Sequence, residues 1–405
     1  MTQNIYDHII IGGGAAGYFA AINLLEDNSN LKVAILERAG RPLIKLGLTG
    51  GGRCNITNGT RDVGDFIKKY PRGGRELRAG LGSFGSDQTM QWFEDHGILL
   101  KEESEGRVFP VSDSAAEVVD YFVARAQQLG VDLYLKCVVT DVIPLTEGFE
   151  ILSSEGSFFS KVVLLASGGM IKPLDWLVNM GHNIIEPIPA LFTLAVPISD
   201  LLDLGGISAT VKLALKGTDF KSEGDLLLTH WGFSGPAVLK LSSFAARWLC
   251  HQDYCAELMV DWLPEENEEA IFKLLKVMKN RSPNKKVVGS TILGLSRKLW
   301  ARFTVRFVSE GSVWGVLSDK ILRRWSSMLK RDSYKILGKG AYKQQFVTAG
   351  GVSLKEVNLK SMESKIVSGL YFAGEVLDVD ALTGGYNLQN AWTTAHLYIK
   401  NFKKA

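Results

Sequence analysis

The chain opens on an apolar segment, residues 5–11, in which only Tyr6, Asp7 and His8 interrupt the hydrophobic run. A strand that is buried on both faces of a parallel sheet has this composition. Glycines follow at once, and residues 15–26 then carry small side chains at helical spacing, before a second apolar run at residues 31–36. This order of strand, helix and strand predicts a parallel βαβ unit.

Residues 41–58 break the periodicity, because Gly, Asn and Thr replace the apolar repeat. We expect a long loop there, and long loops inside compact domains are usually functional. The pattern then predicts helices at residues 88–97 and 115–130 and strands near residues 133–142, 149–152 and 162–166.

Beyond residue 187 the pattern changes to short alternating stretches with glycine breaks, which predict an antiparallel β module. Pro264 and four glutamates precede an apolar stripe that predicts helices to about residue 330, and a Gly-rich, β-type pattern returns after Phe346. The simplest architecture is an α/β nucleotide domain formed by residues 1–187 and 343–405, interrupted by a β-rich insert at 188–263 and a basic helical module at 264–342. A chain of 405 residues suits such a division.

Composition narrows the class of protein. Hydrophobic residues make up 46% of the chain and charged residues 22%, which is the balance of a globular protein. No apolar run reaches membrane-spanning length and no basic n-region precedes the first strand, so we expect a cytoplasmic protein. The four cysteines are too few for a disulfide framework. Cys250, His251 and Cys255 lack a fourth ligand, so we expect no metal site.

A GxGxxG motif, Gly12, Gly14 and Gly17, stands between the first predicted strand and helix. The first glycine permits a tight turn, the second lets a pyrophosphate approach the backbone, and the third lets helix and strand pack closely. Glu37 ends the next strand, where a carboxylate accepts hydrogen bonds from ribose hydroxyls. The motif in this setting predicts a dinucleotide site.

The other end of the chain favours FAD over NAD as the resident cofactor. Residues 369–373 lead into Gly374 and Glu375, and residues 383–389 form a second Gly-rich helix start. We expect Glu375 to bind the ribityl chain, and backbone NH groups near Asn387 and Leu388 to stabilise charge at the flavin N1/O2 edge. An ordinary capped helix after a loop is the alternative.

Several motifs carry a family resemblance: GGGAAG at 12–17, KLGLTGGGRCNITN at 45–58, ASGG at 166–169, THWGFSGP at 229–236, VTAGGV at 347–352 and GEVLDVDALTGGYNLQNA at 374–391. Together they resemble the YhiN/BaiN-like family of bacterial FAD-dependent flavoproteins, over nearly the whole chain. The resemblance implies a Rossmann-type FAD-binding domain of the glutathione-reductase-like superfamily, interrupted by a β-barrel-like insert and a small helical module. Residues 331–345 depart from the family pattern.

The resemblance also implies that residues 49–55 wrap the FAD pyrophosphate and isoalloxazine, with Arg53 near phosphate or flavin and Lys45 nearby. The residues expected to bind FAD are Gly12, Gly14, Ala15, Ala16, Gly17, Glu37, Arg38, Lys45, Thr49, Gly50, Gly52, Arg53, Cys54, Asn55, Val138, Val139, Ser167, Gly168, Gly169, Gly374, Glu375, Asp380, Gly385, Tyr386, Asn387 and Leu388.

Two side chains are candidate catalytic acids. Cys54 stands beside the expected flavin, where a thiol could deliver a proton to the carbon next to the one that receives hydride, and the charge of Arg53 could lower its pKa. A small buried loop residue is the alternative. His230 lies in a Gly-rich turn and is either a second acid or substrate contact, or a loop histidine with satisfied hydrogen bonds.

Residues 271–345 contain 18 Lys and Arg against three Asp and Glu, although the net charge of the chain is only +3. Basic residues neutralise phosphates, and the interleaved aromatics offer stacking surfaces, although many fall at helical spacing and belong in a core. We expect contact with nucleic acid. A solubilising face and docking of an acidic protein are the alternatives.

Flavin chemistry moves a hydride between N5 and carbon or passes electrons to oxygen. Members of the resembling family are associated with reducing a conjugated double bond in steroid enones and in uridine of ribosomal RNA. The basic segment favours the second substrate, so we expect an FAD-dependent reductase of ribosomal RNA uridine with NAD(P)H as the transient donor. A small-molecule ene-reductase or amine oxidase, and an RNA-binding flavoprotein without turnover, are the alternatives.

Overall fold

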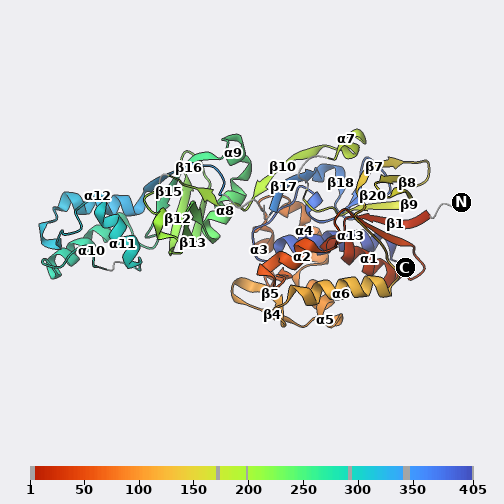
Figure 1. Cartoon of the computed structure of the whole chain (residues 1–405), viewed down its shortest axis with the longest axis horizontal. Helices are drawn as coiled ribbons and strands as arrows, with labels where there is room; N and C mark the ends of the chain where they lie inside the picture. Colours follow the sequence, from red (N-terminus) through yellow and green to blue (C-terminus); the bar gives the residue numbers. More distant parts are fainter. Residues whose placement is uncertain (1–4, 170–173, 198, 291–293, 341–346, 404–405) are drawn as a thin grey trace. The chain divides into compact units, whose positions relative to one another are not determined.

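The computed structural model describes residues 5–169, 174–197, 199–290, 294–340 and 347–403. The chain divides into two compact units (Figure 1). Unit 1 comprises Met1–Ile188 and Val347–Ala405, and unit 2 comprises Pro189–Phe346. The two ends of the chain therefore fold together in unit 1.

A parallel sheet in the order β20-β9-β1-β2-β6 lies at the centre of unit 1. Its strands are β1 (Ile5–Ile11), β2 (Val33–Glu37), β6 (Asp132–Leu135), β9 (Gly156–Leu165) and β20 (Leu370–Phe372). Ile9 is paired with Ala34 on one side and with Val163 on the other, and all three are fully buried. The two-sided burial explains why β1 is apolar almost throughout, and it gives the Rossmann-type arrangement predicted from the sequence.

Smaller elements complete unit 1. Antiparallel strands extend the main sheet at β7 (Val139–Pro144), β8 (Phe149–Ser153), β18 (Val357–Asn358) and β19 (Glu363–Ser364). A three-stranded sheet contains β3 (Thr57–Asn58), β4 (Leu100–Glu102) and β5 (Arg107–Pro110), and β10 (Ile184–Ala190) pairs with β17 (Val347–Val352).

Aromatic packing joins the helices of unit 1 beside the sheet. The helices are α1 (Ala15–Asp27), α2 (Ile44–Leu48), α3 (Val63–Ile67), α4 (Gly74–Ser83), α5 (Ser86–Asp95), α6 (Ala115–Gln128), α7 (Asp175–Asn179) and α13 (Tyr386–Ile399). Phe122 of α6 stacks on Trp392 of α13 with ring centroids 5.8 Å apart, and Phe19 of α1 lies 5.5 Å from the same tryptophan. This core holds α1 and α13, the two helices whose starts carry the motifs, in one rigid layer.

Two expectations for unit 1 are corrected. The single strand predicted at 133–142 is wrong, because Lys136 adopts a φ of 56° and the chain divides there into β6 and β7. The loop predicted at 41–58 contains α2 and a 3₁₀ turn at Thr49–Gly51, which periodicity over so few residues does not reveal.

An antiparallel sheet in the order β11-β14-β13-β12-β15-β16 forms most of unit 2. Its strands are β11 (Leu194–Ala195), β12 (Ser208–Leu215), β13 (Lys221–Thr229), β14 (Gly232–Ser234), β15 (Cys255–Asp261) and β16 (Asp332–Leu337). The strand β16 comes from the stretch that departs from the family pattern, and it alternates buried and exposed residues because one of its faces packs on the core.

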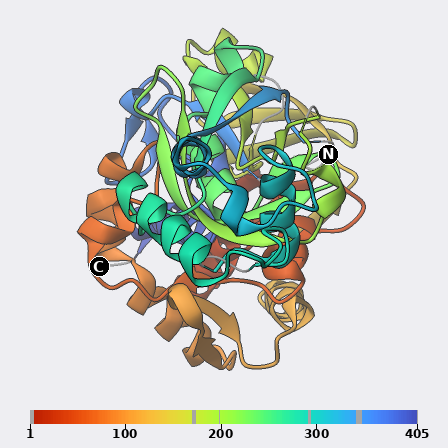
Figure 2. The same ribbon diagram turned by 90° about the vertical axis from the view of Figure 1, so that its left-hand side faces the viewer.

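Helices α8 (Pro236–Phe244) and α9 (Ala246–His251) were not predicted inside the β-rich insert. Pro236 at the first turn and the buried Val238 and Leu241 are the helix signals there. The basic helical module contains α10 (Glu268–Arg281), α11 (Arg297–Val305) and α12 (Asp319–Lys330), which Figures 1 and 2 show beside one another. Helices after Pro264 that end near residue 330 are confirmed.

Candidate flavin site

Gly12, Gly14 and Gly17 of the GxGxxG motif differ in how closely other atoms approach them, in line with the separate tasks expected for a tight turn, a pyrophosphate contact and helix packing. Gly12 has a φ of +116°, and a Cβ there would lie 2.4 Å from the carbonyl oxygen of Ala166 at the end of β9. A Cβ on Gly17 would lie 2.1 Å from the carbonyl oxygen of Gly12, but a Cβ on Gly14 would meet no atom within 4 Å. Gly12 and Gly17 therefore permit close packing, and Gly14 faces open space where a pyrophosphate fits.

The start of α1 offers hydrogen-bond donors next to this space. Gly14 is the N-cap and makes no side-chain cap, and Tyr18 is the first residue whose NH bonds back, to the carbonyl oxygen of Gly14 at 3.0 Å. The NH groups of residues 14–17 have no acceptor within the described ranges. Free NH groups and the positive end of the helix dipole suit an anion.

Glu37 closes the other side of the glycine turn. Its Oε2 accepts from the NH of Gly13 and its Oε1 from the NH of Ala39, both at 2.7 Å. The backbone NH of Cys137 donates to the carbonyl oxygen of Glu37 at 2.9 Å, which brings the exposed Val138 to the end of β2. Both carboxylate oxygens of Glu37 are therefore fixed beside the glycine turn, and residues 137–139 lie next to the end of β2.

The glycine-rich loop, residues 49–58, is built on left-handed backbone. Gly50, Gly51 and Gly52 have φ values of 59°, 70° and 86°, and a Cβ on Gly51 or Gly52 would meet no atom within 4 Å. The NH of Ala115 donates to the carbonyl oxygen of Gly52 at 2.8 Å, which ties the loop to the start of α6. The loop thus presents bare backbone without side chains to block a ligand.

Arg53 is engaged within the protein. Its guanidinium lies 4.0 Å from the centroid of the Phe109 ring and pairs with Glu103 at 2.9 Å and Asp113 at 3.2 Å. The hydrogen bond that Arg53 donates to Glu103 is the main cause that raises the pKa of the guanidinium. Since its charge is balanced by two acids, Arg53 supplies little positive field to its neighbours.

Cys54 is fully buried and adopts a φ of 60°, unusual for a residue with a Cβ. Burial raises the pKa of its thiol to about 12, and this effect exceeds the opposing hydrogen bond with Thr49. The expectation that Arg53 lowers this pKa is therefore wrong, because desolvation outweighs a cation that is already paired. Cys54 holds its proton at neutral pH, and its strained backbone is typical of functional loops.

Asn55 connects the glycine-rich loop to the start of α13. In the orientation that satisfies its amide, its nitrogen donates to the carbonyl oxygens of Thr57 at 2.9 Å and Val108 at 3.1 Å, and its oxygen accepts from the NH of Gly385 at 3.0 Å. Gly385 has a φ of +93°, and a Cβ there would lie 2.2 Å from the carbonyl oxygen of Thr57. The side chain of Gln389 contacts Thr57 Oγ1 at 2.5 Å. Two Gly-rich segments far apart in sequence thus form one structure.

The start of α13 resembles that of α1 in its free donors. The amide of Asn387 folds back and bonds the NH and carbonyl oxygen of Ala381 at 3.0 and 2.9 Å. The NH groups of residues 386–388 have no acceptor in the described part of the chain. The first turn of α13 can therefore stabilise negative charge on a ligand.

Glu375 is held by three donors from separate segments. Its Oε2 accepts from Lys45 Nζ at 3.0 Å and from the NH of Gly169 at 3.1 Å, and its Oε1 accepts from the NH of Thr348 at 3.1 Å. The motifs at 45–58, 166–169, 347–352 and 374–391 therefore converge on one carboxylate. Thr348 was missed, although VTAGGV was recognised as a motif, because its contribution is a backbone NH.

Other predicted residues lie at the edge of this arrangement. Arg38 and Ser167 are exposed, and Gly168 has a φ of +75°. Asp380 is fully buried and forms an ion pair with Arg72, so its carboxylate stabilises the loop before α13.

His230 belongs to unit 2. It is exposed on the turn between β13 and β14, where its ring lies edge-on to Trp231 with centroids 4.3 Å apart. The described residues hold no group of three or more His, Cys, Asp or Glu that could bind a metal ion. Within the same ranges, no helix is long and apolar enough to cross a membrane.

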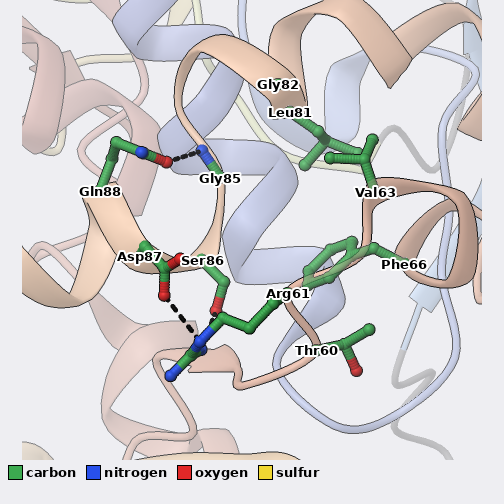
Figure 3. Close-up of a pocket in the computed structure, with 10 residues that line it drawn as sticks. All are labelled: Thr60, Arg61, Val63, Phe66, Leu81, Gly82, Gly85, Ser86, Asp87 and Gln88. Carbon is green, nitrogen blue, oxygen red and sulfur yellow. Dashed lines mark hydrogen bonds and ion pairs between the residues drawn. The ribbon is translucent and has the colours of Figure 1, made fainter.

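A cavity of about 160 Å³ adjoins the glycine-rich loop of unit 1, with Thr60, Phe66 and Ser86 in its wall (Figure 3). Arg61 reaches into it and pairs with Asp87 at 2.7 Å. The cavity is smaller than a cofactor pocket, which exceeds about 300 Å³. Its charge is balanced, so it suits water or a small polar molecule rather than flavin.

Comparison with known proteins places the chain among flavoenzymes. The profile described as HI0933-like protein Rossmann domain matches residues 6–400. The chain is 29% identical over 413 residues to a protein of Escherichia coli K12 named ribosomal RNA dihydrouridine synthase, with 96% of each covered. It is also 29% identical over 404 residues to the 3-dehydro-bile acid delta(4,6)-reductase of Clostridium scindens, with 96% of this chain and 97% of that one covered.

Solved structures share the fold. The 3-ketosteroid-delta4-(5alpha)-dehydrogenase from Rhodococcus jostii RHA1 has a TM-score of 0.53 at 15% identity, covering all of this chain and 98% of that one. A flavocytochrome c3 fumarate reductase has a TM-score of 0.51 at 15% identity, covering 99% of this chain and 79% of that one. At such identity the likeness supports the architecture and carries no information about substrate.

Proposed function

Since the chain belongs to the HI0933-like protein Rossmann domain family and is an FAD-dependent oxidoreductase, we propose that it uses NAD(P)H to saturate the C5–C6 bond of a uridine in ribosomal RNA. The family match confirms the resemblance carried by the motifs and the Rossmann-type FAD-binding fold. The substrate and the electron donor are the proposal.

The names of the two relatives indicate one kind of chemistry. A dihydrouridine synthase and a bile acid delta-reductase both saturate a carbon–carbon double bond conjugated to a carbonyl group. Because the chain is equally similar to both, identity does not choose between them. A small-molecule ene-reductase is therefore the second candidate.

Charge favours RNA over a steroid. Residues 271–345 contain 18 basic residues and only three acidic ones, and this observation carries the choice of RNA as the substrate. A bile acid carries one carboxylate and needs at most one or two cations, whereas RNA carries a phosphate at every nucleotide, and each phosphate neutralised by Lys or Arg releases counterions. An amine oxidase has no use for this charge either.

We assign the following tasks to the chain's own residues. The free NH groups at the start of α1 hold the pyrophosphate, and Glu37 holds the adenosine ribose. The first turn of α13 stabilises charge at the N1/O2 edge, and Glu375 fixes the ribityl side. FAD bound there supplies two-electron hydride chemistry.

Saturation of uridine also needs a proton at the carbon next to the one that receives hydride. Cys54 is a protonated thiol throughout the physiological range, because burial raises its pKa to about 12. We propose Cys54 as the acid because it lies in the glycine-rich loop that contacts the start of α13. Its thiol is fully buried in this structure, so the proposal requires the loop to move before the thiol reaches the substrate. A thiol of such high pKa must be regenerated by proton transfer from solvent before the next turnover.

A deletion strain tests the substrate. Nuclease digests of its ribosomal RNA, analysed by mass spectrometry, are expected to lack one dihydrouridine that returns on expression of the chain. Expression of a Gly14→Asp variant, which places a carboxylate in the open space beside the α1 NH groups, serves as a flavin-deficient control. An unchanged dihydrouridine profile, together with reduction of steroid enones by the purified protein, would favour the second candidate.

Retention of RNA without NAD(P)H oxidation by any acceptor would instead indicate an RNA-binding flavoprotein without turnover.

A further inference from the structure

Some basic residues of unit 2 form ion pairs with acidic side chains and others do not, a difference that the sequence does not show. Near its sheet, Arg302 pairs with Asp203 at 2.6 Å and Lys330 pairs with Asp261 at 2.6 Å. Arg306 pairs with Asp200 and Asp332. Asp332 and three acids from outside residues 271–345 therefore balance much of the charge at the end of the module that adjoins the sheet.

A second group has no such partners. Arg281 ends α10, Lys285 and Lys286 follow in the next loop, and Arg297 and Lys298 begin α11. All of these side chains are exposed, and none forms an ion pair with another described residue. We call these residues the terminal cation cluster. In the adjoining loop, Glu310 is the exposed acid.

Hydrogen bonds hold the segments that carry the cluster together. The NH of Trp314 donates to the carbonyl oxygen of Lys285 at 3.1 Å, and the NH of Val287 donates to that of Ser312 at 3.0 Å. The indole of Trp300 in α11 donates to the carbonyl oxygen of Val287 at 2.9 Å. The loop after α10 and the first turn of α11 are therefore neighbours, so their cations share one surface.

A tryptophan stack lies beneath this surface. Trp300 and Trp325 are 4.6 Å apart at 13°, and Trp314 lies 6.3 Å from each. All three are fully buried. They hold the cations on a rigid base, but they cannot reach a ligand.

This burial decides which feature of RNA the surface can recognise. Within residues 264–290 and 294–340 no aromatic side chain is exposed, since Phe272, Phe303 and Tyr334 are buried and Phe307 is partly so. Recognition of unpaired bases relies on aromatic stacking, whereas recognition of double-stranded RNA relies on shape and phosphates. Among the described residues, the expectation that many of these aromatics belong in a core is thus confirmed, whereas the expectation that they offer stacking surfaces is wrong.

We propose that the terminal cation cluster binds the phosphate backbone of helical RNA without recognising its bases. The inference rests on the proposed function and adds to it a binding surface and a structural class of RNA. It also implies that selection of the target uridine depends on residues outside the cluster. Rigidly held cations suit the regular phosphate spacing of a helix, whereas a flexible acidic peptide would have to be ordered on binding.

Fluorescence anisotropy of the FAD-loaded full chain tests the proposal. The probes are an RNA duplex of about 16 base pairs, a length that one double-stranded RNA-binding domain spans, and a single strand of the same length. The test variant combines K285Q, K286Q, R297Q and K298Q. The control combines K212Q, K216Q, R323Q and R331Q, which remove the same charge from exposed cations that are paired with Glu223, Glu257, Glu269 and Glu268.

The wild-type chain is expected to prefer the duplex and to bind different duplex sequences alike. The cluster variant is expected to bind the duplex at least about tenfold more weakly at low salt, and its slope of log K against log salt is expected to fall by about 3. The control variant should change affinity much less. Flavin absorbance and the melting temperature check that both variants fold.

Equal losses in the two variants would overturn the proposal, as would preference for the single strand. Displacement of the duplex by polyglutamate at an equal concentration of charge would also overturn it, in favour of an acidic protein partner. RNA binding needs no turnover, so the cluster proposal and the proposed function can be refuted independently of each other. Loss of ribosomal dihydrouridine on deletion with undiminished RNA binding by the cluster variant refutes only this inference. Cluster-dependent binding with an unchanged dihydrouridine profile refutes only the proposed function.

Discussion

Adding one methyl group at Gly14 or at Gly17 is expected to separate two tasks of the first turn of α1. A Cβ on Gly17 would lie 2.1 Å from the carbonyl oxygen of Gly12, and real Cβ atoms essentially never come within 3.0 Å of such an atom. The helix must therefore move by roughly 1 Å, at an overpacking cost of about 1–3 kcal/mol. Alanine's better helix propensity offsets about 1 kcal/mol of this.

A Cβ on Gly14 meets no protein atom within 4 Å, and the φ of −95° at this position is accessible to alanine. Gly14→Ala should therefore leave the stability of the apoprotein within about 0.5 kcal/mol of the original. Its methyl group enters the space assigned to the pyrophosphate, so FAD affinity should fall at least about tenfold, which is about 1.4 kcal/mol.

Urea unfolding of the apoproteins and flavin titration by fluorescence quenching measure the two quantities. Gly17→Ala should lower both the urea midpoint and the affinity for FAD, whereas Gly14→Ala should lower the affinity alone. If Gly14→Ala bound FAD as tightly as the original chain, the open space at Gly14 would not be the pyrophosphate site. If the two variants destabilised the apoprotein equally, the difference in packing would be refuted.

Three further predictions concern the loop and its ion pair. Cys54→Ala should retain FAD and lose most turnover in NAD(P)H-driven reduction. In the original chain, folding raises the pKa of the Cys54 thiol from 9.0 to about 12, so the stability linked to this proton is present below pH 9 and is lost as pH rises toward 12. This loss should be missing from the alkaline unfolding profile of the variant. Asn55→Leu leaves the NH of Gly385 without its acceptor and should cost about 1–3 kcal/mol in urea unfolding. Lys45→Ala should change stability by less than about 1 kcal/mol, because the Lys45 side chain is 69% exposed; a larger loss would show that its pair with Glu375 is stronger than a surface pair.

The sequence predicts the Rossmann strands and the glycine turn well, because each depends on local spacing. Burial on both faces leaves a continuous apolar run in β1, and the roles of Gly12 and Gly17 follow from their positions between strand and helix. The strand β16, by contrast, was not predicted from the sequence. Its pairing with β15 joins residues more than seventy positions apart, which local spacing does not reveal. An alternating pattern of six residues is also too short to stand out directly after a long helical segment.

Electrostatics is where the sequence misleads most. Arg306 lies in a strongly basic segment, yet Asp200 and Asp332 neutralise it, and only the fold brings Asp200 to it. The thiol of Cys54 stands next to an arginine in sequence, yet the guanidinium points to Glu103 and the thiol is buried. Charge counts along a chain therefore show an excess, but not which charges are free to meet a partner.

Reaction of the purified, FAD-loaded chain with ribosomal RNA from the deletion strain tests the central claim most directly. Under anaerobic conditions with NADH or NADPH, mass spectrometry of the digested RNA should show one uridine that gains a pair of hydrogens, at a single position. Oxidation of the nicotinamide without any such gain, or a gain that also occurs with the FAD-deficient Gly14→Asp variant, would contradict it.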